Sequence, residues 1–441
     1  MTVQAAVPIR TAAEEQLAAS WQQAKSGLPG PLLLRATAFE RFAKAGLPHR
    51  RVEEWKYTDL RALMRDAKPL AGVPDAAARE RARSAGAALA SIEARRIVLV
   101  DGAFMPELSD LSGLEAGLTI GSLAQALAAG DEAVISQLGT TAPSDDVALA
   151  LNTAFMGDGV VIRVAPGVSL TRPIGLVFFN SGTRPASVFT RSLALIGNGA
   201  RAMLLESHEG APGAADQVNT ALELRVGDEA HVDHVKLTAA GAGALHVSTL
   251  MAAIGGHARF NEFLFNMGAP VVRNQLFIRF DGEGTVAGVR GASLLKGREH
   301  ADTTLVADHI GRACTSRETF KSVLDGKSRS VFQGRITVAP KAQKTDAKMA
   351  AHALLLSEDA EADSKPELEI YADDVQCGHG ATTGALDDDL LFYLKARGIP
   401  AKEAEALLIQ AFVGEAIEQI ADDDLREHVI GIAERWLERR Q

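Results

Sequence analysis

The residues with the most specific chemistry in this sequence are Cys377 and His379, separated only by Gly378. Residues two apart on an extended chain project to the same side, so a thiol and an imidazole would face one space. Both side chains bind iron or zinc. Two donors cannot close a tetrahedral site, so a metal ion here would need further ligands, which a partner protein could supply. By residue type alone a structural role stays open, whereas a Cys–His nucleophilic pair is disfavoured because such close neighbours rarely align for proton transfer.

The other histidine-rich segments give weaker indications of a metal site. Four possible ligands could gather around an ion, or could be ordinary polar residues of a β-structure: His300, Asp302, Asp308 and His309. His231 and His234 lie three apart in a β-like run, so they should point to opposite faces and share no ion.

The composition excludes several classes of protein. The chain has 441 residues with 2 cysteines, which excludes a disulfide framework and a cluster held by four cysteines of its own. Cys314 is expected to be a buried structural thiol. A net charge of −10 disfavours general nucleic-acid binding. No apolar run reaches membrane-spanning length, and residues 1–16 do not resemble a signal peptide, so we expect a cytoplasmic protein without membrane contact.

The elements that must position Cys377 and His379 fall into three regions. Residues 1–156 are predicted to be mainly helical, with a capping box at Thr11–Glu14 and an Ala/Arg/Glu helix over 75–94. Residues 157–376 offer short β-like runs separated by glycine. Residues 377–441 read as a C-terminal helical domain. The last helix carries an apolar stripe on one face, formed by Leu425, Val429, Ile432 and Trp436.

The glycines of the middle region recur at an even spacing. Gly199, Gly227, Gly256, Gly284 and Gly311 are separated by 28, 29, 28 and 27 residues, and a second series interleaves with the first. Aromatic residues are only 5% of the chain and glycines number 40, which suits a core of small side chains. A coil of about 28 residues is the size of one rung of a β-helix. The alternative is a β-sandwich with evenly spaced hairpins, but Asn-Gly and Asp-Gly turns are few.

Several segments resemble the SufB/SufD family of iron–sulfur cluster assembly scaffolds. The similarity is carried by Val375–Gly384 and Leu391–Ile399 near the C-terminus, by Phe332–Val338 and Lys365–Ile370, and by Arg51–Leu60 near the N-terminus. Three features favour the SufD branch: the Arg51–Leu60 segment, Gly380 where the SufB pattern has an acidic residue after the histidine, and the lack of a cysteine between Cys314 and Cys377. That last departure argues against a role as primary sulfur acceptor.

The resemblance implies a right-handed parallel β-helix flanked by helical regions. It also implies a scaffold without catalytic activity, which pairs with SufB through the β-helix end and binds the ATPase SufC through its C-terminal helices. His379, accompanied by Cys377, matches the histidine proposed to help build the nascent cluster at the SufB–SufD interface. The Fe–S cluster would be a transient cargo shared with SufB. Candidate partner-binding residues are Phe392, Tyr393, Arg397, Phe412 and Trp436, although the stripe that holds Trp436 could equally pack inside its own domain.

The sequence leaves other functional interpretations open. A SufB-like subunit would carry a cluster by itself, and the isolated chain could be a homodimer without any cluster. A carbohydrate-active β-helix protein would need clustered aromatics for sugar stacking, and the chain has only 3 Trp and 3 Tyr.

Overall fold

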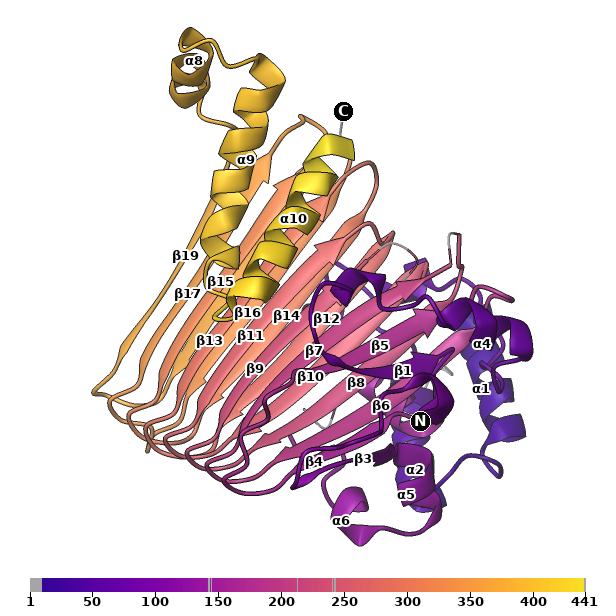
Figure 1. Cartoon of the computed structure of the whole chain (residues 1–441). Helices are drawn as coiled ribbons and strands as arrows, with labels where there is room; N and C mark the ends of the chain where they lie inside the picture. The colour runs from indigo at the N-terminus through magenta and orange to yellow at the C-terminus, as the bar shows by residue number, and fades with distance from the viewer. Residues whose placement is uncertain are drawn as a thin grey trace, which may run out of the picture.

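The computed structural model describes residues 10–439 except 142, 144, 212, 240 and 242. Its centre is a parallel β-solenoid, with helices at the N-terminal end and over one face (Figure 1). From β4 onward, successive strands alternate between two sheets, and each strand pairs in parallel with the strand two places later. This confirms the β-solenoid and rules out the β-sandwich of hairpins.

Two facing sheets form the solenoid. Sheet I has 10 strands, in the order β19 (Gln376–Gly384), β17 (Asp346–Leu355), β15 (Thr315–Leu324), β13 (Val286–Leu295), β11 (Arg259–Met267), β9 (His231–Thr238), β7 (Arg201–Gly210), β5 (Ile174–Asn180), β1 (Arg95–Val100) and β2 (Ala103–Phe104). Sheet II has 9 strands, in the order β18 (Glu361–Ile370), β16 (Arg329–Val338), β14 (His300–His309), β12 (Val271–Phe280), β10 (Leu245–Ile254), β8 (Gln217–Val226), β6 (Ser187–Ile196), β4 (Val160–Val164) and β3 (Leu118–Ser122).

Alternate residues of every strand point into the space between the sheets, which we call the interior. Leu222, Leu224 and Val226 of β8 belong to this core, together with Phe260 of β11 and Phe280 of β12. The turns between strands need glycine where neighbouring coils touch. A Cβ on Gly311 would lie 1.9 Å from the carbonyl oxygen of Gly282 in the preceding coil. The even glycine spacing therefore reflects the recurring turns, where some glycines allow backbone contact between coils and others, such as Gly199 and Gly284, have a positive φ.

Most of the N-terminal helices cover the outer face of sheet II, whereas the helix over residues 76–82 packs on β1 of sheet I. Helix α1 (Ala12–Ala24) begins with the predicted capping box at Thr11. It packs with α2 (Leu32–Ala45) and α7 (Val147–Phe155) through an aromatic cluster that reaches Phe189 of β6. The helix predicted over 75–94 is shorter, because α4 (Ala76–Ala82) ends before Gly86, whose φ is +92°. The remaining short elements are η1 (Glu53–Trp55), α3 (Leu60–Leu63), η2 (Ala87–Leu89), η3 (Pro106–Leu108), α5 (Leu123–Ala128) and α6 (Glu132–Ile135).

The C-terminal helices lie on the outer face of sheet I. Helices α9 (Ala401–Ile417) and α10 (Asp423–Arg439) pack their apolar faces on β7 to β17, whereas α8 (Asp388–Ala396) projects beyond the sheets (Figure 1). Within the described residues, no helix combines the length and the apolar character that crossing a membrane requires.

Candidate functional site at the open end of the solenoid

Cys377 and His379 lie on β19, the last strand of sheet I. In the parallel register Cys377 is opposite Ala347 and His379 is opposite Met349, and both of these β17 residues are buried in the interior. Cys377 packs against the same core cluster, so its side of β19 faces the interior. Because strand residues two apart share a face, the imidazole of His379 projects to that side as well. The expectation that thiol and imidazole share one side of the chain agrees with this register.

The two side chains border an open depression at the end of the solenoid. Lys348, Met349, Gln376 and Gly378 complete its lining. His379 is exposed, whereas Cys377 is half-buried. The depression is therefore accessible to an ion or to a partner chain, and the two candidate ligands stand together on its wall.

The thiol of Cys377 is held in its protonated form. Burial raises its pKa above the ordinary value, and the nearby carboxylates of Asp346 and Glu318 add to the effect, against an opposing hydrogen bond with the Ala347 backbone. A metal ion would have to displace that proton, because the thiolate is the ligand. Among the described residues, no group of three or more His, Cys, Asp or Glu side chains is placed to hold a metal ion. This end of the chain therefore offers two donors and lacks the rest of a closed site.

The backbone edges at this end are also unpaired. Within the part of the chain that the structure describes, β19 and β18 each stand last in their sheets, with a hydrogen-bonded neighbour on one side. Apolar side chains at the same end are exposed to solvent: Ile370 by 41% and Tyr371 by 62%. An unpaired edge beside exposed apolar residues is a template for pairing with another chain.

A buried carboxyl group lies behind the depression. Glu318 of β15 occupies the same register position as Met349 and His379, two strands inward from β19. It is 1% exposed, and neither carboxyl oxygen has a hydrogen-bond partner in good geometry. Burial raises its pKa to about 7, although the Ser316 hydroxyl nearby favours the charged form. Glu318 is thus an ionisable group near the candidate site that titrates close to neutral pH.

The second group of possible ligands makes structural contacts. The Nε2 atom of His300 lies 2.8 Å from the Thr58 hydroxyl, and Asp302 forms a fully buried ion pair with Arg273 at 2.5 Å. Trp55 covers Arg273, whose guanidinium carbon is 3.9 Å from the centre of the ring. The Arg51–Leu60 segment is therefore fastened to sheet II by these residues.

His309 points the other way, into the interior. Its ring stacks on Phe280 with 4.1 Å between centroids, and its Nε2 is 3.1 Å from the Ser316 hydroxyl. Because Asp308 is its neighbour on the same strand, that carboxyl group faces outward. The group His300, Asp302, Asp308 and His309 is therefore divided between the two faces of β14, so among the described residues these side chains are ordinary polar residues of the β-structure rather than a metal cluster.

His231 and His234 occupy opposite faces of β9, as their spacing predicts. His234 belongs to an interior ionic cluster that sequence reasoning missed, which also contains Glu206, His208, Lys236 and Glu262. The Nδ1 atom of His234 is 2.5 Å from Glu262, and Lys236 donates to the Ser248 hydroxyl and, at 2.8 Å, to Asn274. Burial lowers the pKa of Lys236 to about 8 against the opposing charges of Glu206 and Glu262.

A signal for this cluster was present in the sequence. Glu262 follows His234 by 28 residues and Lys236 follows Glu206 by 30, and the members of each pair are register partners on neighbouring strands. Ionisable residues at the coil period occupy neighbouring rungs on the same side, so the spacing predicts a ladder of interacting charges.

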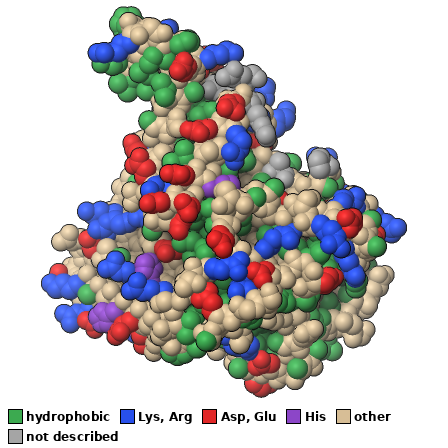
Figure 2. All heavy atoms as spheres, in the orientation of Figure 1, with side chains coloured by type: hydrophobic (Ala, Val, Ile, Leu, Met, Phe, Trp, Pro, Cys, Tyr) green, Lys and Arg blue, Asp and Glu red, His purple; other side chains and the backbone are tan. Residues whose placement is uncertain are grey.

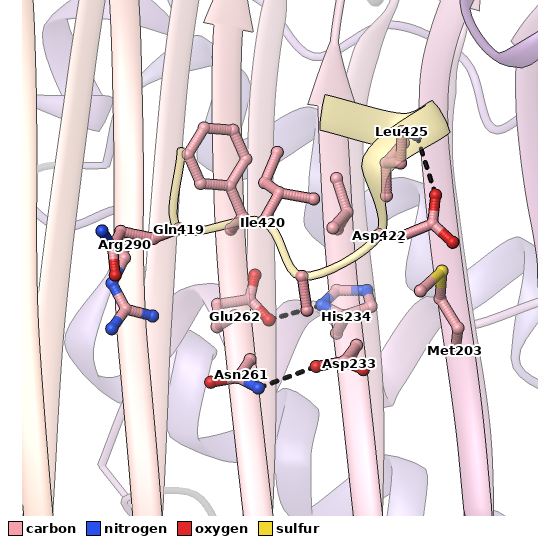
Figure 3. A pocket seen from close by; sticks show the side chains of 13 residues that line it. Met203, Asp233, His234, Asn261, Glu262, Arg290, Gln419, Ile420, Asp422 and Leu425 are labelled. Carbon is pink, nitrogen blue, oxygen red and sulfur yellow. Dashed lines mark hydrogen bonds and ion pairs between the residues drawn. The ribbon is translucent and has the colours of Figure 1, made fainter. Parts of the chain in front are cut away.

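A small pocket lies on the outer face of sheet I, where the turn between α9 and α10 crosses the strands (Figure 3). Asn261 donates to Asp233 at 2.8 Å on its floor, Arg290 borders it, and Gln419 and Asp422 belong to the crossing turn. Asp422 is engaged in capping α10 through the Leu425 backbone. The pocket therefore lies at the contact between the C-terminal helices and the outer face of sheet I.

The five candidate partner-binding residues occupy different environments. Phe392 and Tyr393 of α8 are 72% and 53% exposed, and Arg397 stacks over the Tyr393 ring at 4.5 Å. Figure 2 shows hydrophobic side chains gathered on the projecting part of the molecule that Figure 1 identifies as α8. Phe412 of α9 contacts the ammonium of Lys321 on sheet I, and Trp436 of α10 is 4% exposed. The apolar stripe of α10 is likewise buried against sheet I, so the exposed large apolar side chains described in this domain are Leu390, Phe392 and Tyr393 of α8, with Leu407 of α9.

Comparison with known proteins agrees with this architecture. The sequence model of the family described as "SUF system FeS cluster assembly, SufBD core domain" matches residues 178–412, and that of the "SufBD protein N-terminal region" matches residues 32–176. An iron–sulfur cluster assembly SufBD family protein of Synechocystis is 32% identical over 93% of this chain and 93% of its own length. The iron–sulfur cluster assembly protein SufD of Escherichia coli is 30% identical over 89% of both chains. SufD of Bacillus subtilis is 26% identical over 65% of this chain and 66% of its own.

Proposed function

This chain belongs to the SufBD family of Suf-system iron–sulfur cluster assembly proteins and is a homologue of SufD, and from that premise we propose that it is a scaffold subunit without catalytic activity. In this proposal it pairs with SufB through the open end of the solenoid and contributes His379, with Cys377, to a site where a nascent cluster is assembled. The cluster is a transient cargo, shared with SufB.

The observation that carries the proposal is the incomplete donor set at an unpaired edge. Two soft or borderline donors stand beside the free edges of β18 and β19, so a partner that extends the sheets would bring its own side chains next to them. In this proposal the two donors of this chain do not hold the cluster alone, so separation of the two subunits would leave the cluster with an incomplete ligand set that an acceptor could replace. Free thiols as ligands require a reducing compartment, so the proposal places the complex in the cytoplasm.

The second partner in the proposal is the ATPase SufC, docked on α8. The support is the exposed apolar surface of Phe392 and Tyr393, which projects away from the solenoid and is connected to β19 by residues 385–387. ATP hydrolysis is assigned to SufC, and this chain transmits the resulting movement to the open end.

His379→Ala tests the site assignment. We expect the variant to fold and to assemble with its partners, but to accumulate less iron and acid-labile sulfide on the reconstituted complex. The matched control is His257→Ala, which removes an exposed histidine from a distant turn. Iron and sulfide contents equal to those of the control would refute the role of His379. Anaerobic reconstitution of the isolated chain tests the alternative, because a SufB-like carrier would show cluster absorbance without any partner.

A further inference from the structure

A row of side chains on the outer face of sheet I connects helix α9 to the strand that carries Cys377 and His379. Lys321 of β15, His352 of β17 and Thr382 of β19 are register partners across three neighbouring parallel strands. Their neighbours Phe320 and Ala351 belong to the interior core, so the three side chains of the row face outward, toward α9.

Lys321 ties the row to α9. Its side chain is 5% exposed, its ammonium contacts the carboxylate of Glu415, and the same group lies 4.5 Å from the centre of the Phe412 ring. A buried ammonium is costly unless it is paired, so Lys321 favours the position of α9 that presents Glu415 and Phe412 to it.

His352 ties the row to β19. Its Nδ1 atom is 2.7 Å from the Thr382 hydroxyl, and this side-chain hydrogen bond joins the last two strands of sheet I beyond their backbone ladder. Burial lowers the pKa of His352, the positive charge of Lys321 lowers it further, and the charge of Glu415 opposes the effect. The protonation of His352 therefore depends on both members of the Lys321–Glu415 ion pair. Its partner Thr382 lies three residues after His379 on the same strand.

We propose that Glu415, Lys321, His352 and Thr382 act as positioning residues that couple the placement of α9 to the placement of β19, and thereby to Cys377 and His379. When α9 is seated, Glu415 neutralises Lys321 and β19 is held against β17. When α9 shifts, Lys321 loses its counter-charge and turns toward solvent, the surroundings of His352 change, and the edge strand loosens. This inference depends on the proposed function in one respect: the movement of α9 is attributed to a partner that binds the adjoining helix α8.

Thiol alkylation of the isolated full chain tests this coupling. The chain has 2 cysteines, and mass spectrometry distinguishes iodoacetamide adducts at each. A loosened β19 exposes Cys377 more often, so its alkylation rate rises with the population of the open strand. We expect Glu415→Gln and Thr382→Val each to accelerate Cys377 alkylation by about threefold to tenfold, within the usual range of coupling between linked sites.

The double variant separates coupling from two independent effects. If Glu415 and Thr382 act through one row, the acceleration in Glu415→Gln/Thr382→Val is clearly smaller than the product of the two single accelerations. Thr382→Ser, which keeps the hydroxyl, should restore the original rate. Accelerations that multiply, or a rate in Glu415→Gln equal to that of the original chain, would overturn the proposal.

Cys314 provides the internal control for general destabilisation. It is fully buried in a turn of the solenoid, and burial raises its pKa, so it reacts only when the core opens. We expect its alkylation rate to stay unchanged in all three variants, and parallel acceleration at Cys314 and Cys377 would show that the substitutions only weaken the fold. Glu418→Gln, at an exposed acid of the same helix end, is the matched control and should alter neither rate.

This experiment and the test of the proposed function fail independently. Alkylation of the isolated chain requires neither SufB nor SufC, so a normal metal content in His379→Ala would leave the coupling result intact. Conversely, multiplicative effects at Cys377 would leave the assignment of His379 untouched.

Discussion

Glu318→Gln converts an unpaired interior carboxyl group into a neutral side chain of the same shape. Glu318 is 1% exposed, neither of its carboxyl oxygens has a hydrogen-bond partner in good geometry, and its pKa is raised by burial to about 7. Ionisation of this group therefore opposes folding, because the charged carboxylate is hydrated in the unfolded chain and loses that hydration when it is buried in the folded chain.

The sign and size of the effect follow from this pKa. A carboxyl group whose pKa is higher in the folded than in the unfolded chain binds more protons when folded, so stability falls as pH rises between the two values. With an unfolded value of 4.5 and a folded value of about 7, the free energy of unfolding loses about 2.5 kcal/mol between pH 5 and pH 8 through this group. The loss is complete about one unit above the folded pKa.

Urea denaturation at several pH values between 5 and 8 measures this contribution. A buried amide without partners has its own cost, but that cost does not change with pH, so the decisive quantity is the difference in pH dependence. We expect Glu318→Gln to gain about 2.5 kcal/mol relative to the original chain from pH 5 to pH 8. The control Glu438→Gln removes an exposed acid and should follow the original chain. A constant difference between Glu318→Gln and the original chain at every pH would refute the reasoning.

Three further substitutions test other parts of the structure. Arg273→Met leaves the buried Asp302 carboxylate without its ion pair and should lower the free energy of unfolding by about 3–5 kcal/mol, whereas Arg273→Met/Asp302→Leu should recover most of that loss in the same denaturation assay. Gly311→Ala places a Cβ 1.9 Å from a backbone oxygen and should lower the thermal midpoint by several degrees, whereas Gly72→Ala, with open space around it, should not. Phe392→Asp should abolish co-purification with the ATPase partner while the thermal midpoint of the isolated chain stays unchanged, since this ring is exposed; retained co-purification would place that partner elsewhere.

The coil of the solenoid could be predicted from the sequence because its cause is local and repeats. Glycines of the series stand at the turns between strands, some in close backbone contact with the next coil, as Gly311 with Gly282, and others with a positive φ, as Gly199 and Gly284, so the requirement for glycine returns after every coil. The shared side of Cys377 and His379 was predictable for the same reason, since it needs only an extended chain.

The docking of the helical regions could not be predicted in this way. Arg273 donates to the backbone oxygen of Glu54 across 219 residues of sequence, and no local pattern links the two. The apolar stripe of α10 was visible, but a stripe does not reveal what covers it, and sheet I covers Trp436. The charged interior residues, such as Lys236, were missed because the alternation of apolar and polar residues along a strand predicts only apolar side chains on the interior face. Charged side chains also occur there when they are paired or hydrogen-bonded to one another.

The two ends of the solenoid differ in a way that bears on partner binding. At the N-terminal end the last parallel strands are followed by antiparallel neighbours, β2 beside β1 and β3 beside β4. At the C-terminal end, within the described part of the chain, β18 and β19 have no strand on their outer edges, which in a solitary protein invites aggregation. Because β19 leads through residues 385–387 directly into α8, the bare edge, the Cys377–His379 pair and the exposed apolar helix occupy one continuous stretch of chain. We therefore expect a ligand of either surface to act on the strand that carries Cys377 and His379, which is also the strand that the proposed row from Glu415 to Thr382 reaches.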